Sequence, residues 1–377
     1  MPINSHESVP VPAPRVDPPT RARQVKVTFA ATLATATVAL SGCGVYLEQD
    51  GPELPEPSAS QTIYQQSIRN DLSVEASLAL MDEDCEKCAK YQETIEEHST
   101  ERTEILGGLW EPWEGDVPEG AQVPPEIPDS AQTWDELAEF MVTSGLKNLR
   151  DAAKLTDEED RLAVAAVATG RMADGFKLGA YAGVEKSEIS TWVDPVLAHG
   201  APATPLSADE QDALGNAVRQ WDCAAQLIPL YTATGDSDTP AKEVRGRAQV
   251  QDLLNLSSGV LNADVPDRRV PSCVGTFEKS ATGEDVSPMV RIQNQLAAAN
   301  LELYAQHPQL VVSGVETGAN SLPLDVLVKN IRYWAEQANV PATPGIYVVA
   351  EEEQSVETDS NDGELATFWN PGTGSGE

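Results

Sequence analysis

Apolar residues recur at helical spacing along most of this chain, and no other feature restricts its fold as strongly. The first stripe consists of Tyr64, Ile68, Leu72, Ala76 and Leu80. Further stripes lie within 85–105, 134–149, 162–176, 214–231, 241–260, 289–303 and 324–338. This period is typical of amphipathic helices, and strands do not alternate with helices as they would in a doubly wound sheet. The sequence therefore predicts an all-α fold of about eight helices.

Helix starts and helix breaks divide these elements into two groups. Capping boxes stand at Thr133–Glu136, Thr156–Glu159 and Ser207–Glu210. Proline residues prevent a helix over 110–130, and the periodicity lapses again over 184–206. We therefore expect two antiparallel helical bundles, one over 60–184 and one over 206–340. Whether the two bundles repeat one unit stays open.

The N-terminal segment has the layout of an exported protein. Arg21, Arg23 and Lys26 precede an uncharged run of 14 residues, 27–40, which ends at Ser41-Gly42-Cys43. A basic region, an apolar run and small residues predict a signal peptide over 1–42. The segment resembles the lipobox of bacterial lipoproteins. That resemblance implies that the thiol of Cys43 takes up a diacylglyceryl group and that Cys43 becomes the acylated N-terminus, on the outer face of the cytoplasmic membrane.

The composition predicts the character of the two ends of the mature chain, and it sets the net charge of that chain. Residues 43–59 are rich in proline and acid and predict a flexible tether, and 351–377 predict a disordered acidic tail. Cleavage after Gly42 leaves 335 residues with 21 basic and 58 acidic side chains, a net charge of −37. Such a surface repels phosphate backbones, which argues against nucleic acid as a partner. The expected contact with the bilayer is the lipid on Cys43.

Four cysteines remain in the mature chain besides Cys43: Cys85, Cys88, Cys223 and Cys273. An even number in an exported chain indicates two disulfides with three possible connectivities, of which we favour Cys223–Cys273 and Cys85–Cys88. The spacing of the second pair also occurs in redox and metal sites. A thioredoxin-type dithiol would need a strand before its helix, and none is predicted. His98 would lie about 15 Å away along a helix, too far to share a zinc ion.

The segment 96–104 places His98 and Arg102 one helical turn apart. A helix of this kind within antiparallel four-helix groups resembles the ferritin-like domains of actinobacterial envelope proteins, and the resemblance implies a bundle architecture. Di-iron sites in that family need Glu-x-x-His on two helices, but Ile95 stands three residues before His98. No metal ligand and no cofactor is therefore expected here. We interpret His98 and Arg102 as a buried polar pair bound to a carboxylate.

No motif for nucleophilic catalysis or phosphate binding is present. Trp110 and Trp113 flank a proline-rich loop that could contact a protein or a glycan, or could pack over its own bundle. The sequence predicts a non-catalytic binding or assembly module of the cell envelope, with an unknown envelope protein or glycan as partner. The alternatives are a solute-binding lipoprotein and an extracytoplasmic thiol-redox protein that uses Cys85 and Cys88.

Overall fold

The structure is a computed structural model that describes most of the chain between residues 57 and 348. The described residues are 57–82, 84–110, 127, 131–193, 206–232, 239–263, 265–273, 287–310, 322–348 and 365–367. The predicted signal peptide, Cys43, nearly all of the tether, Trp113 and most of the tail lie outside them.

The all-α prediction is confirmed. The described part contains nine helices: α1 (Ala59–Leu78), α2 (Glu86–Ile105), α3 (Trp134–Ala152), α4 (Glu158–Ala182), α5 (Lys186–Trp192), α6 (Ala208–Thr232), α7 (Thr239–Leu261), α8 (Pro288–Gln306) and α9 (Leu322–Ala335). Two short strands, β1 (Ile346–Val348) and β2 (Leu365–Thr367), pair antiparallel. Among the described residues, no helix has the length and hydrophobicity needed to cross a bilayer.

Local capping explains where several helices begin. Ser207 and Glu210 form the predicted capping box of α6, because the backbone N–H of each residue donates to the side chain of the other. In α4 the cap is Asp157 and not Thr156, since the Asp157 carboxylate accepts the N–H groups of Glu159 and Asp160. The helix therefore starts one residue later than the predicted box.

Helix α5 lies where the sequence predicts only a break. Its seven residues bury Ile189 and Trp192, which are too few apolar positions to produce a recognisable period. The Trp192 ring packs over Gly179 of α4, where an added Cβ would come within 3.0 Å of the ring. A short helix thus covers the end of α4.

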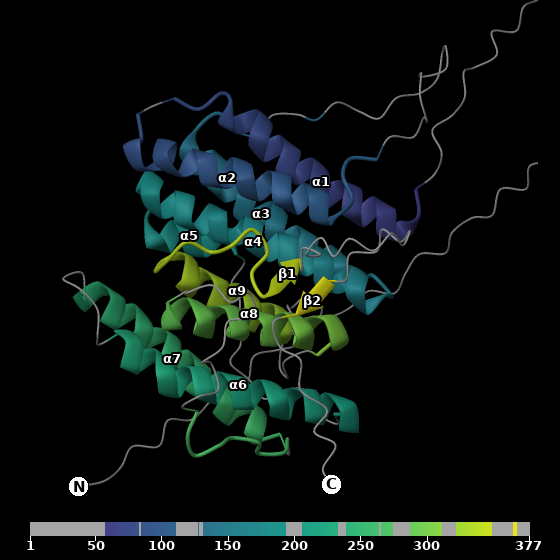
Figure 1. Ribbon diagram of the computed structural model, residues 1–377, viewed down its shortest axis with the longest axis vertical. Coiled ribbons are helices and arrows are strands. Elements are labelled where there is room, and N and C mark those ends of the chain that lie inside the picture. Colours follow the sequence, from purple (N-terminus) through teal and green to yellow (C-terminus); the bar gives the residue numbers. More distant parts are fainter. Residues whose placement is uncertain are drawn as a thin grey trace, which may run out of the picture. The chain divides into compact units, whose positions relative to one another are not determined.

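The helices enclose two hydrophobic cores that share α8 and α9. In Figure 1, α8 and α9 lie between α1–α5 above and α6 and α7 below. The first core lies among α1–α5, and the second lies between α6 and α7 and the two shared helices. Leu301 and Trp334 point into the first core, while Leu296 and Val326 point into the second. The predicted division into domains at 60–184 and 206–340 stays a prediction, and helices of its second part complete the core of the first.

The segment after α9 returns to the first group of helices. An added Cβ on Gly170 of α4 would lie 1.7 Å from the carbonyl oxygen of Ala342, so only glycine permits this approach. Gly345 has a φ of 80° and lies directly against the backbone at Ala298. Strand β1 follows, and Ile346 pairs with Thr367 of β2. Strand β2 was not expected from the sequence and lies within the predicted tail.

Both disulfides have the pairing that we favoured from the sequence. Cys223 on α6 is bonded to Cys273 in the loop before α8, and Cys85 is bonded to Cys88 at the start of α2. Cys223 and Cys273 are 0% and 1% exposed. The first bond therefore joins a loop to a helix inside the second core.

We expect that replacing both Cys223 and Cys273 by serine lowers the melting temperature more than replacing both Cys85 and Cys88. The bonds close loops of 50 and 3 residues, respectively. In the loop-entropy model these loops correspond to about 4 and about 2 kcal/mol of stabilisation. Thermal unfolding followed by circular dichroism measures both. Equal losses for the two double variants would contradict the expectation.

Candidate functional site

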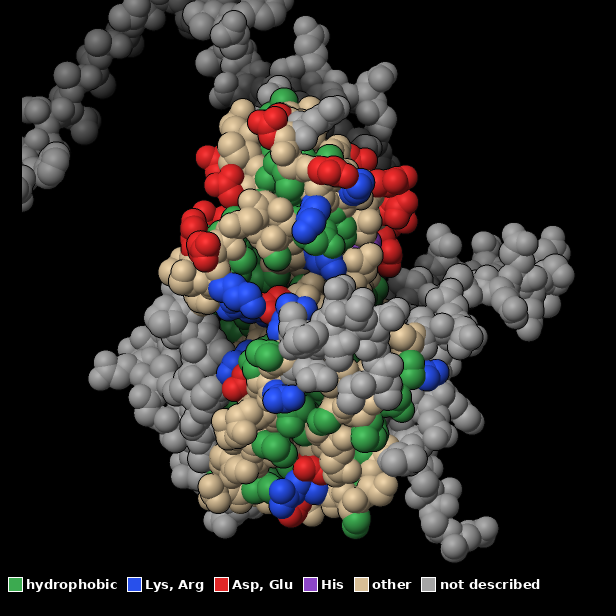
Figure 2. Space-filling model, turned by 90° about the vertical axis from the view of Figure 1, so that its left-hand side faces the viewer, with side chains coloured by type: hydrophobic (Ala, Val, Ile, Leu, Met, Phe, Trp, Pro, Cys, Tyr) green, Lys and Arg blue, Asp and Glu red, His purple; other side chains and the backbone are tan. Residues whose placement is uncertain are grey.

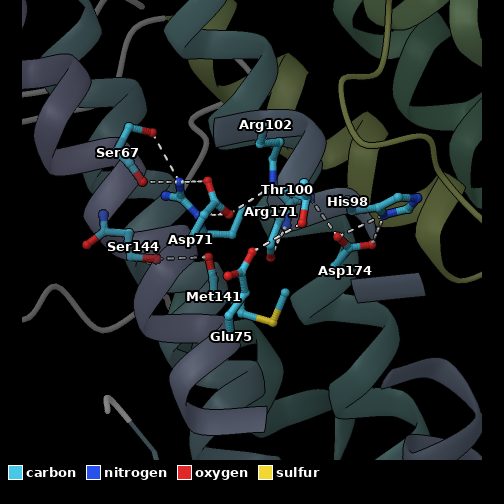
Figure 3. Close-up of polar contacts among 12 residues, drawn as sticks. Ser67, Asp71, Glu75, His98, Thr100, Arg102, Met141, Ser144, Arg171 and Asp174 are labelled. Atoms are coloured by element: carbon cyan, nitrogen blue, oxygen red, sulfur yellow. Dashed lines mark hydrogen bonds and ion pairs between the residues drawn. The ribbon is translucent and has the colours of Figure 1, made fainter. Parts of the chain in front are cut away.

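Two guanidinium groups share one buried carboxylate in the middle of the first group of helices (Figure 3). Asp71 of α1 accepts a hydrogen bond from Nε of Arg102 at 2.9 Å and one from Nε of Arg171 at 3.0 Å. Arg171 also donates through Nη2 to the second oxygen of Asp71. All three side chains are 0% exposed. These are charge-assisted bonds in a site without contact to bulk water.

A second buried carboxylate, Asp174 of α4, accepts three donors from α2. Nη1 of Arg102 lies 2.7 Å from Oδ2, and the hydroxyl group of Tyr91 lies 2.7 Å from Oδ1. Nδ1 of His98 lies 3.0 Å from Oδ1. A carboxylate accepts but does not donate, so this nitrogen carries a hydrogen in the bonded pair. Arg102 thus connects the two carboxylates, as Figure 3 shows.

Helix α3 completes the network through Asn148. Its Oδ1 accepts from Nη1 of Arg171 at 2.8 Å and from Nδ2 of Asn70 at 2.7 Å. Arg171 further donates to the carbonyl oxygen of Ser67. Side chains of α1, α2, α3 and α4 therefore meet in one polar cluster, which we call the Arg–Asp network: Ser67, Asn70, Asp71, Tyr91, His98, Arg102, Asn148, Arg171 and Asp174.

The network pairs two guanidinium groups with two carboxyl groups, and these charges shift the pKa values of several of its members. Burial alone would raise the pKa of Asp174, but the charges and hydrogen bonds of His98 and Arg102 hold that pKa below its usual range. Burial acts to lower the pKa of Arg102, yet Asp71 and Asp174 raise it above its ordinary value. Burial, followed by Asp174, raises the pKa of Tyr91. Near neutral pH Asp174 is therefore ionised and Tyr91 is a donor.

His98 and Arg102 lie in the kind of site that we expected, because both bind one buried carboxylate. They bind Asp174 and not each other. Asp71, Arg171 and Asp174 were not expected from the sequence to belong to this site. The expected stripe ends at Leu80, which lies beyond the end of α1 and is 52% exposed, while the buried face of α1 includes Ser67, Asp71 and Ser77. Their spacing could have indicated a shared polar face, because Ser67 and Asp71 are one helical turn apart, as are Arg171 and Asp174.

The disulfide at the start of α2 borders a surface cleft of about 380 Å³. Cys85 lines the cleft together with Trp134 and the carboxylates of Asp82, Asp135, Glu185 and Glu188. Cys85 is only partly buried, whereas Cys88 is 0% exposed. Cys85 is also the N-cap of α2, and its Sγ accepts the backbone N–H of Cys88 at 3.2 Å.

The remaining predicted contact residues are placed in part. The backbone N–H of Trp110 donates to Oε1 of Gln65 on α1, while Trp113 lies outside the described residues. Within the described ranges, no three His, Cys, Asp or Glu side chains are grouped as metal ligands would be. Comparisons with protein-family models, with characterised proteins and with solved structures gave no match.

We expect Arg102→Met to destabilise the protein by about 3–5 kcal/mol, because it leaves the buried Asp174 without its guanidinium partner. Lys147→Met is the matched control, since its ion pair with Asp151 at 2.6 Å lies at the surface and the lysine side chain is 65% exposed. An exposed pair of this kind contributes about 0–1 kcal/mol. Urea unfolding measures both variants, and similar losses would show that the network does not hold the helices together.

The lowered pKa of Asp174 predicts a dependence of stability on pH. A carboxyl whose folded-state pKa is depressed stabilises the protein above its unfolded value of about 3.9, and this contribution disappears as the pH falls through the folded-state pKa. The difference in unfolding free energy between the wild type and Asp174→Asn should therefore shrink as the pH falls below about 5. Urea unfolding at a series of pH values tests this. A difference that stays constant down to pH of about 2 would contradict it.

Proposed function

We propose that this protein is an extracytoplasmic lipoprotein, anchored through acyl chains on Cys43, and that its helices form a non-catalytic binding or assembly module of the cell envelope. Two features support the location. The succession of basic residues, apolar run and Ser41-Gly42-Cys43 matches a lipoprotein signal peptide. The two disulfides are typical of an oxidising compartment outside the cytosol.

The observation that carries the proposal is the Arg–Asp network. Its buried guanidinium and carboxylate groups are bonded to each other, so the charged groups of the network already have partners. In the ferritin-like bundles that the chain resembles, inward-facing carboxylates and histidines hold metal ions. Here Asp174 instead binds both His98 and Arg102. Because the buried charges of this bundle are paired with each other, we expect a partner to bind at the outer surface.

The outer surface is strongly acidic along α2. Its exposed acidic side chains are Glu86, Glu93, Glu96, Glu97, Glu101 and Glu104. Figure 2 shows acidic side chains gathered on the upper part of the face in view. On α6 and α7, large apolar side chains are exposed instead: Leu230, Tyr231, Val244 and Leu254. An envelope protein or a glycan is the partner class that we propose for such a surface, because its charge disfavours nucleic acid.

A test of the anchor is Cys43→Ala. Without the thiol no thioether to diacylglycerol can form, so we expect the variant to remain unprocessed or to leave the membrane fraction, and to lose incorporation of a labelled fatty acid. The wild type should carry the label on the peptide that begins with Cys43. An alanine variant that fractionates with membranes at mature size would overturn the lipoprotein assignment.

The binding role is tested separately by photo-crosslinking in intact cells. A photoreactive residue at the exposed position Glu97 on α2, or at Leu230 on α6, should give a discrete adduct with an envelope component, and its position shows which surface is used. The exposed Lys154, at the end of α3, serves as a comparison position. Absence of adducts at both test positions in a correctly anchored protein would contradict the binding role.

A further inference from the structure

The two disulfides of this protein differ in how far an external thiol can reach them. Cys223 and Cys273 are both buried, at 0% and 1% exposure. Cys88 is also 0% exposed, but its partner Cys85 is only partly buried and lines the cleft of about 380 Å³. We propose that Cys85–Cys88 is a thiol–disulfide exchange site, at which Sγ of Cys85 accepts a thiolate from a basic polypeptide segment that lies in the cleft.

The position of Cys85 favours exchange at this sulfur. Cys85 is the N-cap of α2, a helix of 20 residues, and its Sγ accepts the backbone N–H of Cys88. After reduction the same N–H would bind a Cys85 thiolate through a charge-assisted bond at the positive end of the helix dipole. Cysteines at helix N-termini have lowered thiol pKa values for this reason. A stabilised thiolate is also a good leaving group in the second half of an exchange.

The cleft indicates the charge of the partner. Four carboxylate side chains line it and are exposed: Asp82, Asp135, Glu185 and Glu188. They disfavour a thiolate at Cys85, but exposed charges are screened by water and salt, whereas the N–H of Cys88 contacts the sulfur directly. The same carboxylates attract a segment with lysine or arginine beside its cysteines. Trp134, which donates through Nε1 to the carbonyl oxygen of Asp82, forms an apolar wall.

The proposed exchange consists of two successive displacements at sulfur. A thiolate of the partner attacks Sγ of Cys85, and the bond between Cys85 and Cys88 breaks. Its electron pair goes to Sγ of Cys88, which takes a proton from water. A second thiolate of the partner then attacks the partner's own sulfur in the mixed disulfide and releases Cys85 as a thiolate. The partner loses two electrons and becomes a disulfide, and the Cys85–Cys88 pair gains them as a dithiol.

This inference adds a covalent reaction to the proposed binding module and shares with it only the oxidising location. The assay uses the full chain in solution with Cys43→Ser, which removes the fifth thiol. Its result is therefore independent of lipid attachment, and failure of the anchor and failure of the exchange are distinguishable.

The experiment incubates the oxidised protein with a lysine-rich peptide that carries two cysteines, followed by alkylation and peptide mapping. We expect Cys85–Cys88 to be reduced at least about tenfold faster than Cys223–Cys273, with one peptide disulfide formed per pair reduced, because attack requires an accessible sulfur. A glutamate-rich peptide with the same cysteine spacing should react more slowly at low salt. Equal rates for the two protein disulfides, or no oxidised peptide, would overturn the proposal.

Two pairs of variants locate the reaction. Cys88→Ser leaves Cys85 free and should accumulate a mixed disulfide with the oxidised peptide, whereas Cys85→Ser should not, because Cys88 is buried. The double variant Asp135→Asn, Glu188→Gln should retain exchange but lose the preference for the basic peptide. The control Asp212→Asn lies outside the cleft and should change neither the exchange rate nor the preference. Trapping at Cys88 alone refutes the assignment of Cys85. An unchanged preference in the cleft variant refutes the assignment of the partner's charge.

Discussion

The first four helices depend on Asp71, a single carboxylate that two arginines share. Removing these charges from water costs several kcal/mol for each ion, and only good geometry compensates for it. That geometry requires α1, α2 and α4 to supply Asp71, Arg102 and Arg171 at matching heights. A shift of one residue along a helix is about 1.5 Å, which is enough to break bonds of 2.9–3.0 Å. The network therefore specifies the register of the helices more than it adds to their total stability.

The two cores use different polar chemistry. Among the described residues around the second core, several buried polar contacts join neutral groups: Gln249 and Gln293 exchange hydrogen bonds, and the indole of Trp221 donates to Asn300. A buried disulfide adds a covalent constraint at Cys223 and Cys273. Neutral amides cost less to desolvate than ions, so this core does not need the exact charge matching of the first. The orientation of its helices is restricted by the disulfide and by packing on α8 and α9.

Much of the fold could be predicted from the sequence, because apolar periodicity and caps are local signals. Apart from α5, the helices after residue 133 lie close to the expected ranges, and Ser207 caps α6 as predicted. Prediction was wrong where tertiary contacts override the local pattern. On α1, Asp71 is buried because Arg102 and Arg171 approach it from other helices, while Leu80 lies beyond the end of the helix and is exposed. His98 and Arg102 could be singled out, but their shared partner Asp174 lies more than 70 residues away in sequence.

The sharing of α8 and α9 between the two cores has a consequence for how the chain is made. A polypeptide emerges from the ribosome with its N-terminus first, so α1–α5 are complete long before α8 and α9 exist. Until then, the surface of the first core that Leu301 and Trp334 cover faces water. The growing chain thus passes through a stage in which the first core is incomplete and part of its apolar surface is exposed. Helices α8 and α9 therefore close a core that α1–α5 begin.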